Sequence, residues 1–437
     1  MKISVIGCGY LGAVHAASMA ELGHDVVGVD VDPAKIEALG QGKAPFFEPG
    51  LDEILQSASQ SGRLSFSTDI RDVTGAAIHF IAVGTPQRKG ENAADMTYVD
   101  AAVEALLPHL LPGDLVVGKS TVPVGTAARL AAILDDAGTG ALLAWNPEFL
   151  REGFAVRDTI TPDRLVYGVP PGEPGKLAAA LLDEVYASAL AAATPLVVTD
   201  YATAELVKVA ANAFLATKIS FINAMAEIAE VTGGDVTALA EAIGYDARIG
   251  RRFLNAGIGF GGGCLPKDIR AFTARAEELG RGDSLAFLKE IDNINLRRRE
   301  RMVAMVVESL DGQVHRKKVA VLGLAFKPDS DDVRDSPALD VAVRLNGLGA
   351  SVIATDPAAI PNSIRLHPQL GFATDTRDAL HGAHAVVLVT EWKQYSELDP
   401  VETGELVRDK LVIDGRNVLD PAAWRRAGWV YRGMGRP

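Results

Sequence analysis

One segment combines a reactive side chain with an unusual backbone. Residues 257–268 read GIGFGGGCLPKD, and five of the twelve are glycine. Because glycine is entropically costly to order, this density favours close approach of the backbone to a ligand over ordinary packing. A helical pattern begins directly after Cys264 with Pro266 in its first turn, and a thiol at a helix N-terminus tends towards the nucleophilic thiolate. Cys264 is therefore a candidate nucleophile, with Asp268 on the same helix face; the alternative is a buried, inert cysteine.

Two other pairs of residues, each four positions apart, have side chains that could serve such a nucleophile. Lys208 and Asn212 would project from one face of a helix, and an ammonium group with an amide can stabilise an oxyanion. Glu148 and Glu152 could supply a general base and a binding carboxylate. Taken alone, each pair is more often a solvated helix face.

The beginning of the chain has a pattern typical of dinucleotide binding. A short β-rich run leads into GCGYLG at residues 7–12, then a helical pattern, then a second strand that ends at Asp30. Gly7 permits the tight turn, Gly9 lets a pyrophosphate approach the backbone, and Gly12 lets the helix pack against the strand. Asp30 can accept hydrogen bonds from both ribose hydroxyls and would repel a 2′-phosphate, which favours NAD over NADP. The alternative is a glycine turn used only for packing.

The elements that must position these residues follow an α/β rhythm. Apolar strands are expected at residues 77–83, 115–117 and 141–145, each followed by polar or turn residues. Ligands bind at the carboxyl ends of parallel strands, so these loops are candidate ligand contacts. Residues 202–231 have helical spacing without Pro or Gly, which predicts one long helix.

The C-terminal part, residues 317–437, returns to α/β and echoes the N-terminal strand, turn and second strand. FKPD replaces its glycine loop, so the pyrophosphate fingerprint is lost. We therefore predict an α/β fold with two Rossmann-like doubly wound domains joined by a helical middle domain with a long spine helix. The expected domains are an NAD-binding domain at 1–200, a helical central or dimerisation domain at 201–310, and a second nucleotide-binding-like domain at 311–437, for which a purely structural role is the alternative.

Composition limits the class of partner. The chain has 437 residues, a net charge of −13 and 48% hydrophobic residues, which argues against nucleic acid or an anionic membrane as the main partner. Its two cysteines lie far apart, without metal-ligand spacing or a disulfide framework. We expect a soluble cytoplasmic protein without a metal.

Several motifs together resemble the UDP-glucose 6-dehydrogenase family, within the UDP-glucose/GDP-mannose dehydrogenase superfamily. The motifs are GFGGGCLPKD, STVPVG, NPEFLREG, ELVKVAANAF and AFKPDSDDVRDSP, in the order of the family and over nearly the whole chain. The resemblance implies a homodimer through the central helices and an NAD-dependent, four-electron oxidation of UDP-glucose to UDP-glucuronate.

The resemblance also implies roles for individual residues. Cys264 would carry a thiohemiacetal and then a thioester, which water activated by Glu148 would hydrolyse. Lys208 and Asn212 would stabilise the oxyanions, and Asp268 with Thr121 and a water would handle the alcohol proton.

The resemblance implies two sets of ligand contacts, one for the cofactor and one for the substrate. Arg248 is at the position of an arginine that, in the family, reaches the substrate of the other subunit. Cofactor contacts are Gly7, Gly9, Tyr10, Leu11, Gly12, Asp30, Lys35, Val83, Gly84, Thr85, Pro86, Ser120, Thr121, Glu152 and Arg334. Substrate contacts are Glu148, Phe149, Leu150, Arg151, Glu152, Lys208, Asn212, Asn255, Gly257, Gly259, Phe260, Gly261, Lys327 and Arg416.

Alternative functions remain open from the sequence. A GDP-mannose or UDP-N-acetyl-hexosamine 6-dehydrogenase would share the core motif. A non-catalytic nucleotide-binding protein would retain the fold, but intact Cys264, Lys208 and Glu148 argue against it.

Overall fold

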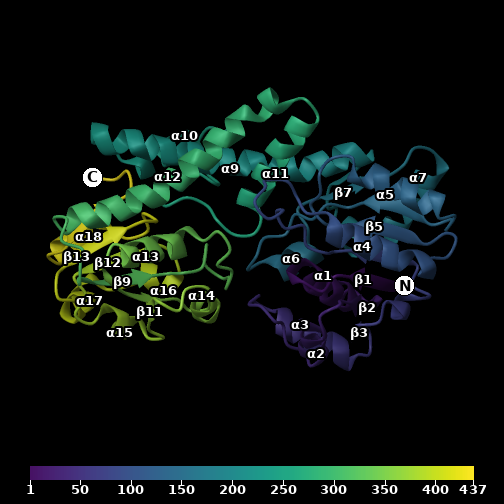
Figure 1. Ribbon diagram of the computed structural model, residues 1–437, viewed down its shortest axis with the longest axis horizontal. Coiled ribbons are helices and arrows are strands. Elements are labelled where there is room, and N and C mark those ends of the chain that lie inside the picture. The colour runs from purple at the N-terminus through teal and green to yellow at the C-terminus, as the bar shows by residue number, and fades with distance from the viewer. The chain divides into compact units, whose positions relative to one another are not determined.

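A computed structural model describes all 437 residues, which form two compact units. The first unit comprises residues 1–211 and 274–280, and the second comprises residues 212–273 and 281–437. Each contains one largely parallel sheet with accompanying helices (Figure 1). The predicted fold class is therefore confirmed.

The sheet of the first unit has eight strands in the order β3-β2-β1-β4-β5-β6-β7-β8, with one antiparallel contact between β6 and β7. Its first six strands have the doubly wound order, so the switch point lies between β1 and β4. The strands are β1 Lys2–Ile6, β2 Asp25–Val29, β3 Leu64–Ser67, β4 Ile78–Ile81, β5 Leu115–Gly118, β6 Leu142–Trp145, β7 Leu165–Gly168 and β8 Leu196–Thr199. Its α-helices are α1 Tyr10–Glu21, α2 Pro33–Gly40, α3 Leu51–Gln60, α4 Thr97–Leu106, α5 Thr126–Asp136, α6 Ala155–Ile160, α7 Glu173–Val185 and α8 Ala187–Ala191.

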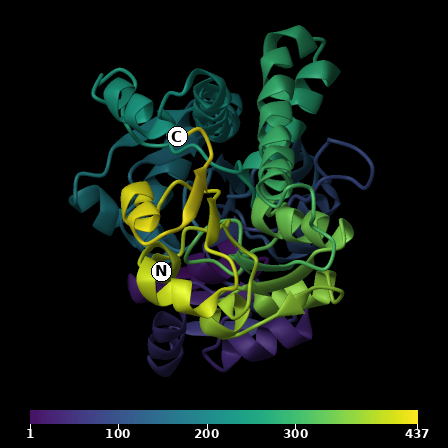
Figure 2. The same ribbon diagram turned by 90° about the vertical axis from the view of Figure 1, so that its left-hand side faces the viewer.

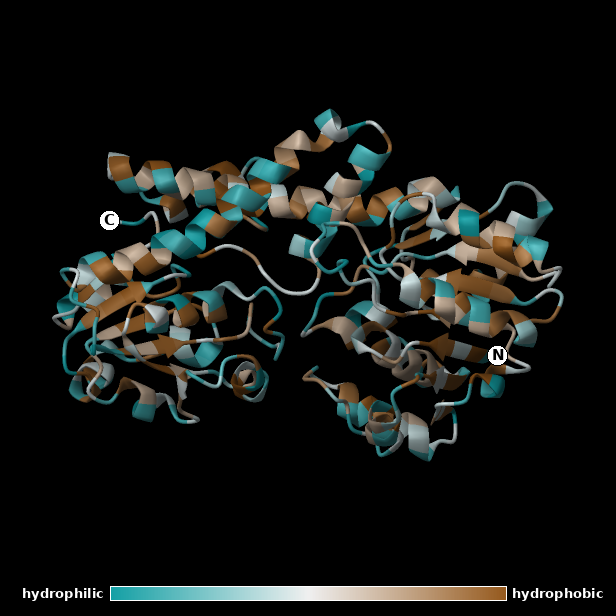
Figure 3. Cartoon of the chain, in the orientation of Figure 1, coloured by the Kyte–Doolittle hydropathy of each residue, from teal (hydrophilic) through white to brown (hydrophobic).

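Burial on both faces explains why the central strands read as continuous apolar runs. In β5, Leu115 and Val117 belong to one buried cluster while Val116 belongs to the cluster on the opposite face. Figure 3 shows the strands of both sheets largely in the hydrophobic colour. The sheet thereby presents its carboxyl ends, with the loops that follow β1, β4, β5 and β6, as the natural place for ligands.

The second unit repeats the doubly wound order with six parallel strands, β11-β10-β9-β12-β13-β14. Its strands are β9 Lys318–Leu322, β10 Ser351–Thr355, β11 Gly371–Phe372, β12 Ala385–Leu388, β13 Leu411–Asp414 and β14 Val430–Gly433. Its α-helices are α10 Val236–Gly244, α12 Ala286–Ser309, α13 Pro337–Gly347, α14 Ile360–Leu366, α15 Thr376–Leu380, α16 Lys393–Ser396, α17 Pro400–Leu406 and α18 Pro421–Arg426. The predicted second nucleotide-binding-like fold is present.

Two helices run from one unit into the other along the chain, α9 at Tyr201–Thr232 and α11 at Leu265–Glu278. The 32 residues of α9 span about 48 Å at ~1.5 Å per residue, as the uninterrupted helical spacing predicts. By length and composition α9 would also be able to cross a membrane, a test that core helices of soluble proteins pass as well. The helix α11 begins at the residue after Cys264, as predicted.

The end of the chain packs on the helical part of the second unit. Figures 1 and 2 both place the C-terminus next to α10. The Val236 N–H at the start of α10 donates to the Gly435 carbonyl at 2.8 Å. The C-terminal residues thus connect α10 to the sheet of the same unit.

Candidate active site

The turn after β1 has the geometry that a pyrophosphate needs. Gly7 has a φ of +91°, and a Cβ on Gly12 would overlap the Gly7 carbonyl oxygen. A Cβ on Gly9 would meet no atom within 4 Å, so the space over this residue is open. No side chain caps the N-terminus of α1, which begins at Tyr10. Free N–H groups and open space fit the phosphates of NAD.

Asp30, directly after β2, organises the same turn. Its carboxylate accepts from the Cys8 N–H at 2.7 Å, the Asp32 N–H at 3.0 Å and the Lys35 ammonium group at 2.9 Å. One oxygen receives two of these bonds and the other receives one, which leaves capacity for a ribose hydroxyl. Burial raises the pKa of the Cys8 thiol, so this cysteine acts as a small buried side chain.

The loops after β4 and β5 are tied to each other. The Ser120 hydroxyl donates to the Val83 carbonyl at 2.6 Å, and the Thr85 hydroxyl donates to the Thr121 carbonyl at 2.7 Å. These are residues for which cofactor contacts are predicted, together with Gly84 and Pro86. The structure therefore brings the predicted residues of two strands into one cluster beside the switch point.

Glu148 lies in the loop after β6, half-buried. Desolvation raises the pKa of its carboxyl, and the positive charges of Lys119 and then Lys208 oppose that rise. Lys208 is 9% exposed, and its ammonium nitrogen lies 5.6 Å from the ring centre of Phe149. Glu148, Phe149 and Lys208 thus lie together in the first unit.

The alternative in which Glu148 and Glu152 belong to a solvated helix face is wrong. Residues 146–152 contain no helix, and α6 begins only at Ala155. Hydrogen bonds to a distant residue hold the end of this segment instead, since Glu48 accepts the Gly153 N–H at 2.7 Å. In this loop the Arg151 guanidinium pairs with Asp158 at 2.6 Å, whereas the charge of Glu152 helps to raise the pKa of Tyr10.

Two buried glutamates hold the loops of the first unit and were not predicted. Glu48 accepts from the Gly153 and Ala155 N–H groups, each at 2.7 Å, and from the Tyr10 hydroxyl. Glu205 on α9 accepts from the N–H groups of Gly125 and Ala127, also at 2.7 Å each. Nothing local in the sequence marks these contacts, because they join segments that are 80 and 105 positions apart.

In the second unit, Cys264 is exposed, forms no disulfide and lies directly before α11. Its carbonyl accepts the Asp268 N–H at 2.9 Å. The buried Asp268 carboxylate accepts from the Asn212 amide at 2.7 Å and from the Lys267 ammonium group at 2.5 Å. The predicted nucleophile, carboxylate and amide therefore belong to one connected group.

The buried face of α12 holds the glycine loop before Cys264. Asn295 accepts the Phe260 N–H at 2.6 Å and donates to the Phe260 carbonyl at 2.9 Å. Arg298 donates to the Gly257 carbonyl at 3.2 Å, and Arg299 to the Asp335 carbonyl at 3.1 Å. None of these α12 side chains was predicted to serve the loop.

The reason given for the glycines of this loop needs correction. They do not leave open space for a ligand, because an added Cβ would collide with the protein itself. At Gly257 it would lie 2.7 Å from the Gly415 carbonyl oxygen, and at Gly262 it would lie 2.8 Å from the Phe326 ring. Close packing within the second unit is what excludes side chains here.

Arg416 ties the glycine loop to the C-terminal sheet. Its guanidinium donates to the carbonyls of Val389 at 2.9 Å, Gly259 at 3.0 Å and Phe326 at 3.2 Å. Glu391 lies 3.1 Å from the same group. The guanidinium of Arg416, a predicted substrate contact, thus already donates hydrogen bonds to three carbonyls of the protein itself.

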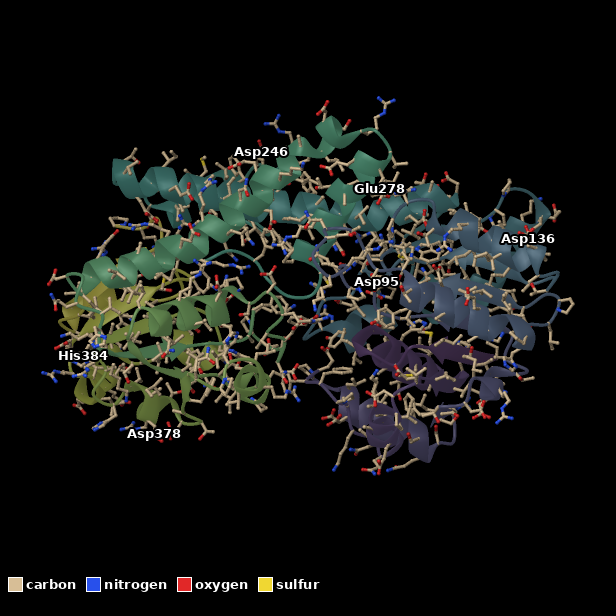
Figure 4. All side chains as sticks on the ribbon, viewed as in Figure 1. Asp95, Asp136, Asp246, Glu278, Asp378 and His384 are labelled. Atoms are coloured by element: carbon tan, nitrogen blue, oxygen red, sulfur yellow. The ribbon has the colours of Figure 1, made fainter.

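The remaining predicted residues of the second unit lie nearer the surface. Asn255 accepts from Arg251 at 2.8 Å, and Arg334 pairs with Asp332 at 2.7 Å. The Arg248 side chain is 89% exposed and pairs with Asp246, which Figure 4 labels. Lys327 lies over the Phe326 ring at 5.4 Å.

The predicted residues therefore fall into two groups, one in each unit. Lys208 belongs to the group in the first unit and Asn212 to the group in the second. Both are on α9, one turn apart.

Comparison with known proteins covers most of the chain. Residues 1–190 match the NAD binding domain of the UDP-glucose/GDP-mannose dehydrogenase family, residues 202–297 its central domain, and residues 320–421 its UDP binding domain. The chain is 41% identical over 440 residues to a UDP-glucose 6-dehydrogenase of Rhizobium meliloti, with 100% of both covered. It is 42% identical over 442 residues to UDP-glucose 6-dehydrogenase TuaD of Bacillus subtilis, covering 100% of this chain and 93% of that one.

A solved structure is similar over the whole length. The UDP-glucose dehydrogenase of the hyperthermophilic archaeon Pyrobaculum islandicum has a TM-score of 0.89 and 39% identity to this chain. The match covers 100% of this chain and 98% of the archaeal one.

Asp30→Ala tests the ribose contact. Losing hydrogen bonds to a charged acceptor costs about 1.5–3 kcal/mol, so the KM for NAD is expected to rise roughly 10- to 100-fold. The KM for the second substrate should change little. Asp32→Ala is the matched control, because that neighbouring carboxylate caps α2. Steady-state kinetics with each substrate varied measures both constants, and equal rises in both would contradict a ribose role.

Proposed function

The chain belongs to the UDP-glucose/GDP-mannose dehydrogenase family, and we propose that it is an NAD-dependent UDP-glucose 6-dehydrogenase that forms UDP-glucuronate. The observation that carries the chemistry is the exposed thiol of Cys264, which is in no disulfide, at the start of α11. A nucleophile at this place allows the C6 alcohol to pass through the aldehyde to the acid without release.

Cys264 acts as the acyl carrier in this proposal. Bound NAD supplies the hydride acceptor for each of the two oxidations. The thiolate adds to the C6 aldehyde and gives a thiohemiacetal, loss of hydride turns that into a thioester, and water hydrolyses the thioester to the carboxylate and free thiol. One alcohol and one water thus give one carboxylate, with two hydrides and three protons released. The helix N-terminus favours the thiolate that starts this sequence.

Further residues stabilise charge or accept protons in these steps. Lys208 and Asn212 stabilise the oxyanions, and Asp268 orients Asn212 through the bond at 2.7 Å. Glu148 serves as the general base for hydrolysis, and its raised pKa brings it nearer to the working pH. Asp268, with Thr121 and a water, receives the alcohol proton.

We assign the remaining roles by domain. Residues 1–200 bind NAD, residues 201–310 form the central domain, and residues 311–437 bind the UDP-sugar, with Lys327 and Arg416 among its contacts and Arg334 towards the cofactor. A reducing cytoplasm suits an enzyme whose nucleophile is a thiol that must not be oxidised to a disulfide.

The reaction stoichiometry tests the function. Purified protein with limiting UDP-glucose and excess NAD is expected to form two NADH per sugar, because each molecule passes through two oxidations. NADH absorbance at completion measures this ratio. GDP-mannose and UDP-N-acetylglucosamine run in parallel as controls; turnover of either, with none of UDP-glucose, would overturn the substrate assignment.

Cys264→Ser tests the covalent step. The hydroxyl is a far weaker nucleophile at neutral pH, so turnover should fall by roughly a thousandfold or more, with at most one NADH per active site. Calorimetric titration with NAD and UDP-glucose is the control, since both should still bind. Wild-type turnover in this variant would remove Cys264 from the mechanism.

The helix α9 also supports a homodimer. Phe214, Phe221 and Ile228 are spaced seven residues apart, and their side chains are 48% to 67% exposed. Such spacing places apolar side chains along one side of a helix, the pattern of a helix pairing surface. We propose that two copies pair along α9, and that Arg248 of each reaches the substrate of the other.

Phe221→Asp tests this pairing. A carboxylate in the middle of an apolar seam is expected to shift the protein from dimer to monomer and to reduce activity at the same time. Light scattering with size-exclusion chromatography measures the mass. Leu177→Asp, at an exposed leucine on α7, is the control and should not change it. A dimer that persists in Phe221→Asp would place the interface elsewhere.

A further inference from the structure

Lys119 is a buried lysine without an ion-pair partner. It follows β5, is 5% exposed, and donates to the Asn146 side-chain oxygen at 3.0 Å and the Tyr186 hydroxyl at 3.1 Å. The Tyr186 hydroxyl donates to the same Asn146 oxygen at 2.6 Å. No carboxylate oxygen lies within 4.0 Å of the ammonium nitrogen. A buried charge in this setting is unfavourable unless a charge further away compensates it.

The surroundings of Lys119 leave one candidate for that compensation. Its nitrogen lies 5.8 Å from the ring centre of Phe80 and 5.6 Å from that of Tyr186. His15, whose ring packs on Phe80 at 4.4 Å, is buried and its pKa is lowered well below the usual value, so it is neutral. Glu148 is the acidic group whose charge acts on Lys119.

Lys119 and Glu148 each affect the pKa of the other. Burial lowers the pKa of Lys119 to about 8, and the charge of Glu148 opposes that decrease. Lys119 is the first of the groups that oppose the rise in the pKa of Glu148; Lys208 is the second, and Asp158 acts the other way. Burial and Glu148 raise the pKa of Tyr186, which therefore stays protonated.

Asn146 connects this charge to the loop of Glu148. It directly follows β6 and stands two residues before Glu148. Its amide group donates to the Val166 carbonyl at 3.0 Å, so both ends of the side chain are fixed. The bond from Lys119 thus joins the end of β5 to the start of the loop after β6.

We propose that Lys119 is a positioning residue for thioester hydrolysis: through its hydrogen bond to Asn146 it fixes the start of the loop that carries Glu148, and it places a buried positive charge beside that loop. The proposal rests on the function proposed above, in which Glu148 is the base. Lys119 touches neither substrate nor cofactor in this account.

Lys119→Met tests the role of the charge. Glu148 works as a base only when ionised, so a higher pKa moves the acidic limb of the kcat–pH profile to higher pH. We expect a shift of roughly one pH unit, which is a tenfold loss of kcat below the limb. The difference should disappear at higher pH, where Glu148 is ionised in both proteins. The KM values for NAD and UDP-glucose should stay within about twofold.

Controls separate charge from structure. Tyr186→Phe removes a hydrogen-bond partner but keeps the ammonium group, so its limb should not move. In a Glu148→Gln background, Lys119→Met should cause no further loss, because both changes act on the same step. A loss that is equal at every pH, with an unmoved limb, would overturn the proposal. If Lys119→Met does not fold, Asn146→Asp replaces it as the test, because a carboxylate in contact with Lys119 neutralises the charge of the ammonium group. An acidic limb that does not move in Asn146→Asp would likewise overturn the proposal.

A titration without substrate keeps this proposal distinct from the function itself. Carboxyl-labelled glutamate gives a resonance for Glu148, identified by its loss in Glu148→Gln. Its pKa should be higher in Lys119→Met than in wild type and unchanged in Tyr186→Phe. An equal pKa in all three overturns the role of Lys119 whether or not UDP-glucose is oxidised, whereas inactivity towards UDP-glucose overturns only the proposed function.

Discussion

The loop that carries the thiol has no regular structure of its own and depends on side chains of α12. Buried backbone groups need hydrogen-bond partners, and in residues 257–260 these partners are largely side chains. Asn295 satisfies both the N–H and the carbonyl of Phe260, as a neighbouring strand would, and it is fully buried. Arg298 satisfies Gly257 from the next turn of the helix. The position of Cys264 therefore depends on the packing of α12 against the loop.

This dependence explains why so many glycines precede the thiol. The loop is enclosed by α12, by the segment at Asp335 and by the residues after β13, so that a side chain would displace backbone atoms. Gly259, with a φ of +96°, packs against Asn295 itself. Close packing and a left-handed conformation limit the position to glycine. The exposed thiol then projects from a rigid base, which a nucleophile needs if the electrophile is to be held at one place.

Patterns within a short stretch of sequence predicted the elements well. The strand, turn and helix around residues 2–30, the bounds of α9 and the start of α11 depend on neighbouring residues. Contacts between distant residues could not be predicted in this way. Glu48 and Gly153 are 105 positions apart, and Asn295 and Phe260 are 35 apart. The solvated helix face considered as the alternative for Glu148 and Glu152 is absent, because residues 146–152 form a loop.

The same fold position has two different uses in this chain. Asp30 follows β2 and Asp356 follows β10, so the two are equivalent in the doubly wound order. Asp30 retains capacity for another donor. One oxygen of Asp356 accepts from the N–H groups of Leu324 and Ala325 and from the Trp392 indole, and the other accepts from the turn that follows. A carboxylate with all its acceptor sites filled cannot bind a ribose. In the second unit the acidic residue thus serves to hold the turns around it, and a ligand bound there needs other contacts.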